Sequence, residues 1–383
     1  MKDFNFIIPQ DIQVGIGSLS KLPTMLQKLN STHTFIISDR GLESIGVVKK
    51  VQDIIESSGL KCSSYLDVIP NPSVDCVNEA TESYKKCGAT SIIALGGGSP
   101  MDVAKAVGVL ATYGGDIRDY EGPDKVPGDI VPTIAIPTTA GTGSEVTASA
   151  VITDEERNYK LSVLSFKTTP SQVILDPTLI MTAPAFVAAP TGIDAFIHAM
   201  EAYLSLNSNL FTDAFAEKAM SLIGGNIRRF VANRKDEEAA YAMMVGSTFA
   251  GFAFAWARLG NIHALSHPVS AYYHVAHGVA NAILMPAIVE FNALADKDGK
   301  YEKIYNFLSG ESKPVKDFKP YMLADLIRKL NAELGIPKGL AEVGVKEEGF
   351  EAMANDAIKS GNILVNPRQT TLKDCIDLYK ASM

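Results

Sequence analysis

The residues best suited to chemistry are histidines, and five of the six lie in the second half of the chain. Asp194 precedes His198 by four residues, a spacing that places both side chains on one helix face, about 5–6 Å apart at Cβ. The remaining histidines of this half would fall within roughly 80° of each other on one unbroken helix: His263, His267, His274 and His277. Three neutral imidazoles and one carboxylate form a site for a divalent transition metal. We therefore expect the chemistry in this part of the chain.

The elements that must position these residues change in character along the sequence. Up to about residue 180, short β-rich runs (34–38, 63–68, 91–95, 133–136, 171–175) alternate with helical stretches (42–58, 73–87, 101–112). This alternation predicts a parallel α/β layer. Long helical periodicities follow, for example at 212–232, 236–257, 321–334 and 371–381. We expect a Rossmann-like, dinucleotide-binding α/β domain over residues 1–182 and an all-helical, metal- and substrate-binding domain over residues 183–383.

Two glycine-containing loops follow predicted strands of the α/β domain. In the first, Gly96-Gly97-Gly98-Ser99, glycines let the backbone approach a ligand, and the start of the next helix offers free N–H groups to a pyrophosphate. Ser99 is the expected N-cap of that helix, with Asp102 three residues later as in a capping box. A tight strand-to-helix turn is the alternative. The second loop, residues 137–145, has similar chemistry, and two such loops at strand ends of one sheet favour a ligand site.

The usual dinucleotide fingerprint GxGxxG is absent, because Ser20 stands where the third glycine would follow Gly15-Ile-Gly17. Asp39, directly after a predicted strand, has the chemistry to accept hydrogen bonds from an adenosine ribose and to repel a 2′-phosphate. A turn residue is the alternative for Asp39. Asp39 precedes the Gly96–Ser99 loop, whereas the acidic residue of the usual fingerprint follows its glycines by about 20 residues. Any nucleotide is therefore expected to bind with a topology different from that of the usual fingerprint.

The composition excludes several classes of protein. The net charge is −8 and there is no basic cluster, which argues against nucleic acid. The four cysteines show no CxxC spacing and are expected to be reduced thiols. The N-terminus has no apolar stretch like that of a signal peptide. The sequence also has no uninterrupted run of about 20 apolar residues that could cross a bilayer. We expect a cytoplasmic protein that does not bind membranes.

Four motifs, in this order, closely resemble those of the iron-dependent (type III) alcohol dehydrogenases. They lie at 96–102 (GGGSPMD), 137–145 (PTTAGTGSE), 191–203 (TGIDAFIHAMEAY) and 277–286 (HGVANAILMP). Asn366-Pro-Arg368 near the C-terminus is also similar to theirs, so the resemblance covers essentially the whole chain. It implies an NAD(P)-binding α/β domain and a helical metal domain acting on an alcohol or aldehyde, in a homodimer or a larger homo-oligomer.

The resemblance also implies roles for individual positions. It makes Asp194, His198, His263 and His277 the metal ligands and His267 the carrier of the alcohol proton, although a structural helix histidine is the alternative for His267. It implies a substrate pocket containing Phe254 and Asn362, and a set of cofactor-binding residues: Asp39, Gly97, Gly98, Ser99, Asp102, Thr138, Thr139 and Lys160. Asp39 occupies the position that favours NAD(H) over NADP(H). Fe²⁺ follows from the resemblance alone, since the donor set also accepts Zn²⁺ or another divalent transition metal.

The expected reaction is hydride transfer between NAD(H) and a short-chain primary alcohol or diol, or the corresponding aldehyde. A divalent metal lowers the pKa of bound water from about 15.7 towards roughly 7–9, and an alcohol should respond similarly. At about 1.36 kcal/mol per pKa unit, this effect supplies on the order of 9–12 kcal/mol of deprotonation free energy. Because histidine side chains ordinarily titrate near neutrality, His267 would pass the proton to solvent.

The chain departs from the resemblance at Arg258, in Trp256-Ala-Arg258, and at His274. If Arg258 faces the substrate, it would pair with a carboxylate or sulfonate on a short aldehyde, whereas a helix-surface charge is the alternative. His274 is expected to be a pocket or surface residue. Two other functions stay open: a metal- and NAD-dependent lyase of the dehydroquinate synthase type, and a non-catalytic nucleotide-binding protein.

Overall fold

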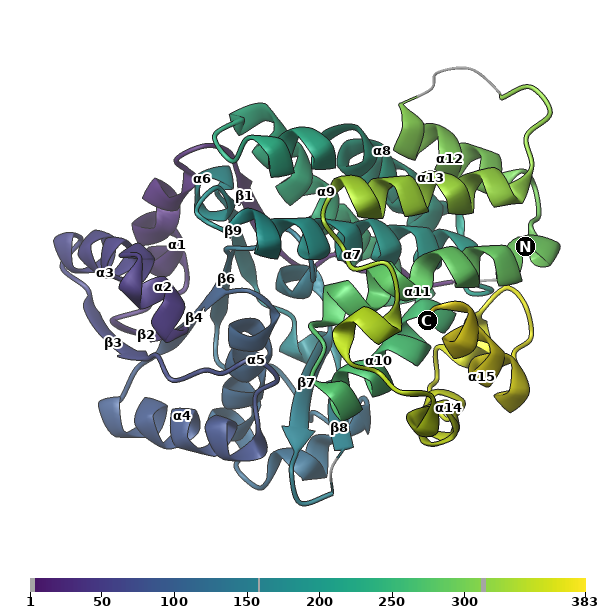
Figure 1. The fold of residues 1–383 in the computed structure, drawn as a ribbon. Helices are drawn as coiled ribbons and strands as arrows, with labels where there is room; N and C mark the ends of the chain where they lie inside the picture. Colours follow the sequence, from purple (N-terminus) through teal and green to yellow (C-terminus); the bar gives the residue numbers. More distant parts are fainter. Residues whose placement is uncertain (1–3, 158, 311–314) are drawn as a thin grey trace. The chain divides into compact units, whose positions relative to one another are not determined.

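The computed structural model describes residues 4–157, 159–310 and 315–383, and the chain divides into two compact units (Figure 1). One unit spans Ile7–Thr182, and the other comprises Ala183–Met383 together with the chain up to Phe6. The first described residues join the helical unit because Phe6 packs on the rings of Phe215 and Trp256, with centroid distances of 5.7 and 5.5 Å.

A parallel sheet forms the centre of the α/β unit, as predicted, and it has six strands. Its order is β1-β9-β6-β4-β2-β3. The strands are β1 (Asp11–Val14), β2 (His33–Ile37), β3 (Lys61–Tyr65), β4 (Ser91–Gly96), β6 (Thr133–Pro137) and β9 (Gln172–Leu175). The central strands β4 and β6 are buried along their whole length, which explains why their sequences are continuous apolar runs rather than alternating ones.

The helices of this unit are α1 (Leu22–Lys28), α2 (Arg40–Ser44), α3 (Val47–Ser57), α4 (Val74–Cys87), α5 (Gly98–Tyr113) and α6 (Pro177–Ile180). The helix predicted over 42–58 is in fact two helices. Gly46 separates them with a left-handed backbone, φ 80°, which interrupts the helical hydrogen bonds. The helix predicted over 73–87 is confirmed as α4, and the Ser73 side chain caps it by accepting from Cys76 N–H.

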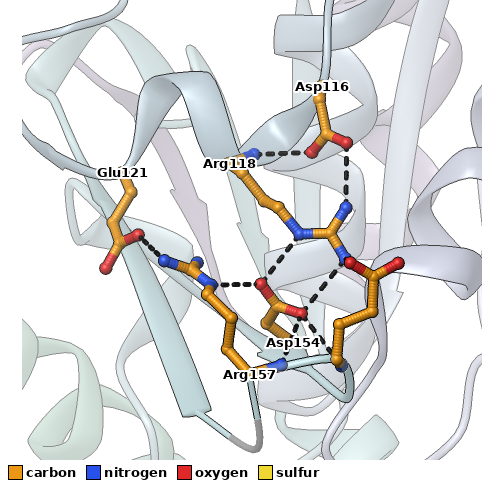
Figure 2. Close-up of polar contacts among 6 residues, drawn as sticks. Asp116, Arg118, Glu121, Asp154 and Arg157 are labelled. Carbon is orange, nitrogen blue, oxygen red and sulfur yellow. Dashed lines mark hydrogen bonds and ion pairs between the residues drawn. The ribbon is translucent and has the colours of Figure 1, made fainter.

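A second, three-stranded sheet was not predicted. It contains β5 (Gly122–Pro123), β8 (Tyr159–Leu164) and β7 (Ser149–Asp154), and β7 pairs antiparallel with β8. At the end of β7 the fully buried Asp154 faces Arg118 and Arg157 (Figure 2). Arg118 donates from Nε to Oδ2 at 2.8 Å and from Nη2 to Oδ1 at 3.1 Å. These hydrogen bonds from Arg118 hold the pKa of Asp154 well below its usual range, against the effect of burial.

The second unit is helical, as predicted. Its α-helices are α7 (Ala185–Leu204), α8 (Leu210–Ala232), α9 (Glu237–Ala257), α10 (Asn261–Tyr273), α11 (His277–Asn292), α12 (Lys300–Ser309), α13 (Pro320–Glu333), α14 (Phe350–Ala357) and α15 (Leu372–Ala381). Helices α7, α8 and α9 pack against one another along their lengths (Figure 1). Gly246 makes one close approach possible, since a Cβ there would lie 2.7 Å from the Ile223 side chain.

The four later histidines do not share one helix, contrary to the geometry assumed from the sequence. Helix α10 ends at Tyr273, and His274 adopts a left-handed conformation, φ 56°, before α11 begins at His277. His277 therefore opens a new helix and reaches His263 by the packing of α11 against α10.

Two helices are long and apolar enough to cross a membrane by length and composition, namely Glu237–Ala257 and the helical stretch His277–Ala295. In the helical unit 67% and 61% of these windows are buried, as is usual for core helices of a folded unit.

Candidate metal centre and cofactor loops

Helix α7 carries the first two predicted ligands, one turn apart. Asp194 and His198 are both buried, and Asp194 Oδ1 lies 4.0 Å from His198 Nε2. Helix α11 lies unusually close to α7, because a Cβ at Gly278 would be 2.4 Å from the carbonyl oxygen of Pro190. This close approach places His277, the neighbour of Gly278, opposite Asp194.

The other two predicted ligands come from different helices and face the same carboxylate. Asp194 Oδ1 lies 3.6 Å from His263 Nε2 and 3.9 Å from His277 Nε2. The ligand atoms of these three residues all lie within 4.8 Å of one another. Two ligands at about 2.1 Å from a tetrahedral ion are about 3.4 Å apart, so a small inward movement would let these atoms share one cation. The donor set therefore fits a divalent transition metal.

Asn281, which the sequence analysis missed, marks the point where the ligand atoms converge. Its Nδ2 lies 2.6 Å from Asp194 Oδ1, 3.2 Å from His263 Nε2 and 3.1 Å from His277 Nε2. Its Oδ1 is buried without a hydrogen-bond partner among the described residues. The available signal was its position four residues after His277 on one helix.

The charges of the centre are strongly coupled. Burial alone would raise the pKa of Asp194, but the imidazoles of His198, His277 and His263 outweigh it and hold that pKa below the usual range. Burial would lower the pKa of His263, yet the two carboxylates beside it, Asp194 and Glu201, raise it. A proton and a metal cation therefore compete for Nε2 of His263, the nitrogen that faces Asp194.

One aromatic side chain and a further histidine lie beside the proposed ligands. The ring of Phe254, a predicted pocket residue, stacks on His198 with a centroid distance of 4.5 Å. His267 is exposed, and its ring centroid lies 5.4 Å from that of His277. This position suits a group that exchanges protons with solvent.

Arg258 ends α9 in a rare backbone conformation, φ 64° and ψ −175°, which is almost restricted to glycine. Its guanidinium lies against Gly361, where a Cβ would be 2.9 Å from Nη2. Asn362, another predicted pocket residue, follows Gly361 and is half-buried. Arg258 and Asn362 are thus neighbours in the fold.

In the α/β unit, three predicted cofactor segments meet at one sheet edge. Asp39 follows β2, the glycine loop follows β4, and Thr138 follows β6; these three strands are adjacent and parallel. The glycine loop touches the second loop. A Cβ at Gly97 would lie 3.3 Å from Thr139 Oγ1, and one at Gly98 would lie 3.0 Å from Thr142 Cγ2.

Two expectations about the first loop are wrong in detail. Helix α5 begins at Gly98 with Gly97 as its N-cap, so Ser99 lies inside the first turn and caps nothing. Asp102 does not form a capping box. Its carboxylate accepts from Ser144 Oγ at 3.0 Å and from Val151 N–H at 3.2 Å, and it thereby ties α5 to the second loop and to β7.

Asp39 and Lys160, also predicted to bind the cofactor, form hydrogen bonds within the protein. Asp39 is the N-cap of α2 and accepts from Leu42 N–H at 2.9 Å through Oδ1. Lys160, on β8, donates to Asn71 Oδ1 at 2.7 Å. Burial lowers the pKa of Lys160, against the attraction of Asp102.

Comparison with known proteins agrees with this arrangement. The family model described as iron-containing alcohol dehydrogenase matches residues 9–177, and that of the C-terminal part of the Fe-containing alcohol dehydrogenase family matches residues 188–383. The chain is 37% identical over 383 residues to an NAD-dependent methanol dehydrogenase of Bacillus methanolicus, covering 99% of this chain and 100% of that protein. It is 35% identical over 380 residues to a 1,3-propanediol dehydrogenase of Citrobacter freundii, covering 98% of each.

Among solved structures, an alcohol dehydrogenase from Oenococcus oeni matches with a TM-score of 0.96 and 34% identity over 100% of both chains. The family models cover most of the sequence, and the relatives match it from end to end. The chain belongs to the iron-containing alcohol dehydrogenase family and is an oxidoreductase of alcohols or aldehydes.

Proposed function

We propose that this enzyme transfers a hydride between NAD(H) and a short-chain primary alcohol or diol, or the corresponding aldehyde. The observation that carries the proposal is the convergence of Asp194, His263 and His277 from three helices on one point, with His198 one turn from Asp194.

Asp194, His198, His263 and His277 are the proposed ligands of one divalent metal, Fe²⁺ by family and Zn²⁺ by the chemistry of the donors. When bound, such a metal polarises the oxygen of an alcohol or aldehyde. Phe254 covers His198 and keeps water from that side of the centre. His267, exposed beside His277, carries the alcohol proton to solvent.

The cofactor is proposed to bind at the carboxyl edge of the six-stranded sheet. The first N–H groups of α5, at Gly98 and Ser99, would face the pyrophosphate, since Gly97 and Gly98 leave no side chain in the way. Thr138 and Thr139 border the same loop. Asp39 keeps Oδ2 for a ribose hydroxyl and favours NAD(H), because its charge would repel a 2′-phosphate. Asp102 and Lys160 support this site through the second loop and β8.

For the substrate, we propose that Arg258 favours aldehydes that carry an anionic group. A backbone conformation that is costly for arginine suggests a role beyond a surface charge, and Phe254 on the preceding turn contacts His198. A carboxylate or sulfonate would pair with the guanidinium in a bidentate manner. Losing Arg258 would then reduce kcat/KM for acidic aldehydes more than for neutral ones.

The test of the main proposal is metal analysis of anaerobically purified protein, followed by NADH oxidation with short aldehydes. Fe²⁺ or Zn²⁺ at about one per chain and metal-dependent turnover are expected. The protein stripped of metal should lose turnover and regain it when the same metal is added. A protein that binds NAD(H) without any turnover would support the non-catalytic alternative. Conversion of a sugar phosphate without net NADH consumption would support the lyase.

We also propose a cytoplasmic homo-oligomer, most simply a homodimer. In the α/β unit, β1 is an edge strand and Val14 at its end is exposed, a feature that a second chain can cover. Light scattering of the purified protein measures the mass directly. A single-chain mass at micromolar concentration would contradict this proposal.

A further inference from the structure

Besides Asp194 and His198, helix α7 carries the ionisable side chain of Glu201, whose role the sequence analysis did not identify. It is buried, with 5% of its surface exposed. Glu201 Oε2 lies 2.6 Å from His263 Nδ1, and Glu201 Oε1 accepts from the backbone N–H of Ile262 at 2.6 Å. Both carboxylate oxygens are therefore used at the start of α10, next to the metal centre.

The start of α10 has no side-chain cap of its own. Gly260 occupies the N-cap position, and two distant side chains accept from the first N–H groups instead: Glu201 from Ile262 N–H, and Asn366 from Asn261 N–H at 3.2 Å. A carboxylate is favourable there because the helix dipole places partial positive charge at this end.

Gly260 leaves the space that this arrangement needs. A Cβ at position 260 would lie 3.0 Å from Glu201 Oε1 and 3.0 Å from Asn366 Oδ1. Both are polar atoms fixed by their own hydrogen bonds, so a side chain at this position would push one of them away.

The motif Asn366-Pro-Arg368, which had no assigned role, holds the other side of this contact. The amides of Asn366 and Asn292 pair reciprocally, at 2.8 and 3.0 Å, and Asn366 Nδ2 also donates to the carbonyl of Arg368 at 2.7 Å. The side chain that accepts from Asn261 N–H is therefore fixed in orientation.

We propose that Glu201 is a positioning residue that keeps the proton of His263 on Nδ1 and thereby keeps Nε2 available for the metal. A carboxylate only accepts hydrogen bonds, so the ring nitrogen 2.6 Å from Glu201 must carry a proton. The opposite nitrogen, Nε2, is the one that faces Asp194 Oδ1 at 3.6 Å. The inference rests on the proposed metal site and adds to it a selection between the two imidazole tautomers.

Glu201→Gln is the decisive variant because the amide keeps the shape of the side chain but has an N–H donor in place of one carboxylate oxygen. If the amide oxygen still accepts from Ile262 N–H, the amide N–H group faces Nδ1 and requires it to be unprotonated, which leaves the proton on Nε2. If the amide turns over, two N–H groups collide at Ile262. We expect the affinity for Co²⁺ or Zn²⁺ to fall by 10- to 100-fold, as is common for such outer partners.

The measurement is chelator competition on metal-stripped protein, with a parallel thermal melt without metal. The matched control is Glu217→Gln on α8, since Glu217 likewise accepts a hydrogen bond, but from the Tyr203 hydroxyl instead of a histidine. We expect the control to bind metal like the unmodified protein. Equal affinity in Glu201→Gln and the control would overturn the inference.

A second test measures the protonation of the His263 ring in the unmodified protein. In the Zn²⁺-loaded protein with ¹⁵N-labelled histidine, the His263 ring should show a proton on Nδ1 and metal coordination at Nε2. Coordination through Nδ1 would overturn the inference even if Glu201→Gln fails to fold. If the unmodified protein binds no metal, the proposed function itself fails; the Nδ1 proton, read in the metal-free protein, then still tests the contact with Glu201.

Discussion

Replacing Lys105 by methionine tests how helix α5 is held to the second glycine-containing loop and to β7. Lys105 lies on α5, is fully buried, and donates from Nζ to Ser144 Oγ at 2.9 Å and to the carbonyl of Ser149 at 2.8 Å. Burial lowers its pKa to about 8, although the nearby carboxylates of Asp102 and Glu145 act in the opposite direction.

The sign of the pH dependence follows from this pKa. Between about pH 8 and 10.5 the unfolded chain keeps the proton of Lys105 while the folded chain loses it, so the contribution of Lys105 to stability rises with pH. The full change corresponds to about 3 kcal/mol, since each pKa unit is worth about 1.36 kcal/mol. Roughly 2 kcal/mol of it falls between about pH 7.5 and 9.5.

Urea denaturation followed by circular dichroism at several pH values measures this change. Trp256, the single tryptophan, lies in the helical unit and would not report on α5. The free energy of unfolding of the unmodified protein, minus that of Lys105→Met, should increase by about 2 kcal/mol from about pH 7.5 to 9.5. The control Lys85→Met, at an exposed position on α4, should show no such increase. A constant or shrinking difference for Lys105→Met would refute the reasoning.

Three further substitutions have defined outcomes. Asp154→Asn should lower Tm at pH 7. The difference in Tm between the unmodified protein and the variant should narrow as the pH falls through the lowered pKa of Asp154, because the ion pair with Arg118 is present above that pKa and lost below it. A difference in Tm that persists at low pH would contradict this. Arg258→Gly should raise stability by about 1–3 kcal/mol over Arg258→Ala, since only glycine adopts that backbone without strain, and equal melting temperatures would remove the argument. Gly278→Ala should lower the free energy of unfolding by about 1–3 kcal/mol and weaken metal binding, because its Cβ would lie 2.4 Å from the Pro190 carbonyl oxygen. Unchanged metal affinity in chelator competition would show that the approach of α11 to α7 does not position His277.

The sequence predicted the parallel sheet and most helix positions correctly, because apolar periodicity and capping residues act locally. Ser73 before α4 and Asp236 before α9 are examples, since each side chain caps the helix that follows it. The β7–β8 hairpin was missed although β8 carries a local signal, since buried Leu161 and Val163 alternate with polar residues and the burial of β7 alternates in the same way. Ser99 was wrongly expected to cap α5, since glycine residues at the turn let the helix begin two residues earlier, with Gly97 as its N-cap.

By itself, the sequence determined which donor atoms the chain possesses and the helical spacing of Asp194 and His198, because residues four apart lie on one face of any α-helix. Only the tertiary structure decided which of the later histidines face that pair. His274 breaks the helix, so His277 reaches Asp194 through the contact of α11 with α7 at Gly278. The positions of Glu201 and Asn281 around His263 depend on the same packing, since their partners lie 62 and 18 residues away in the chain. No local pattern encodes contacts over such separations.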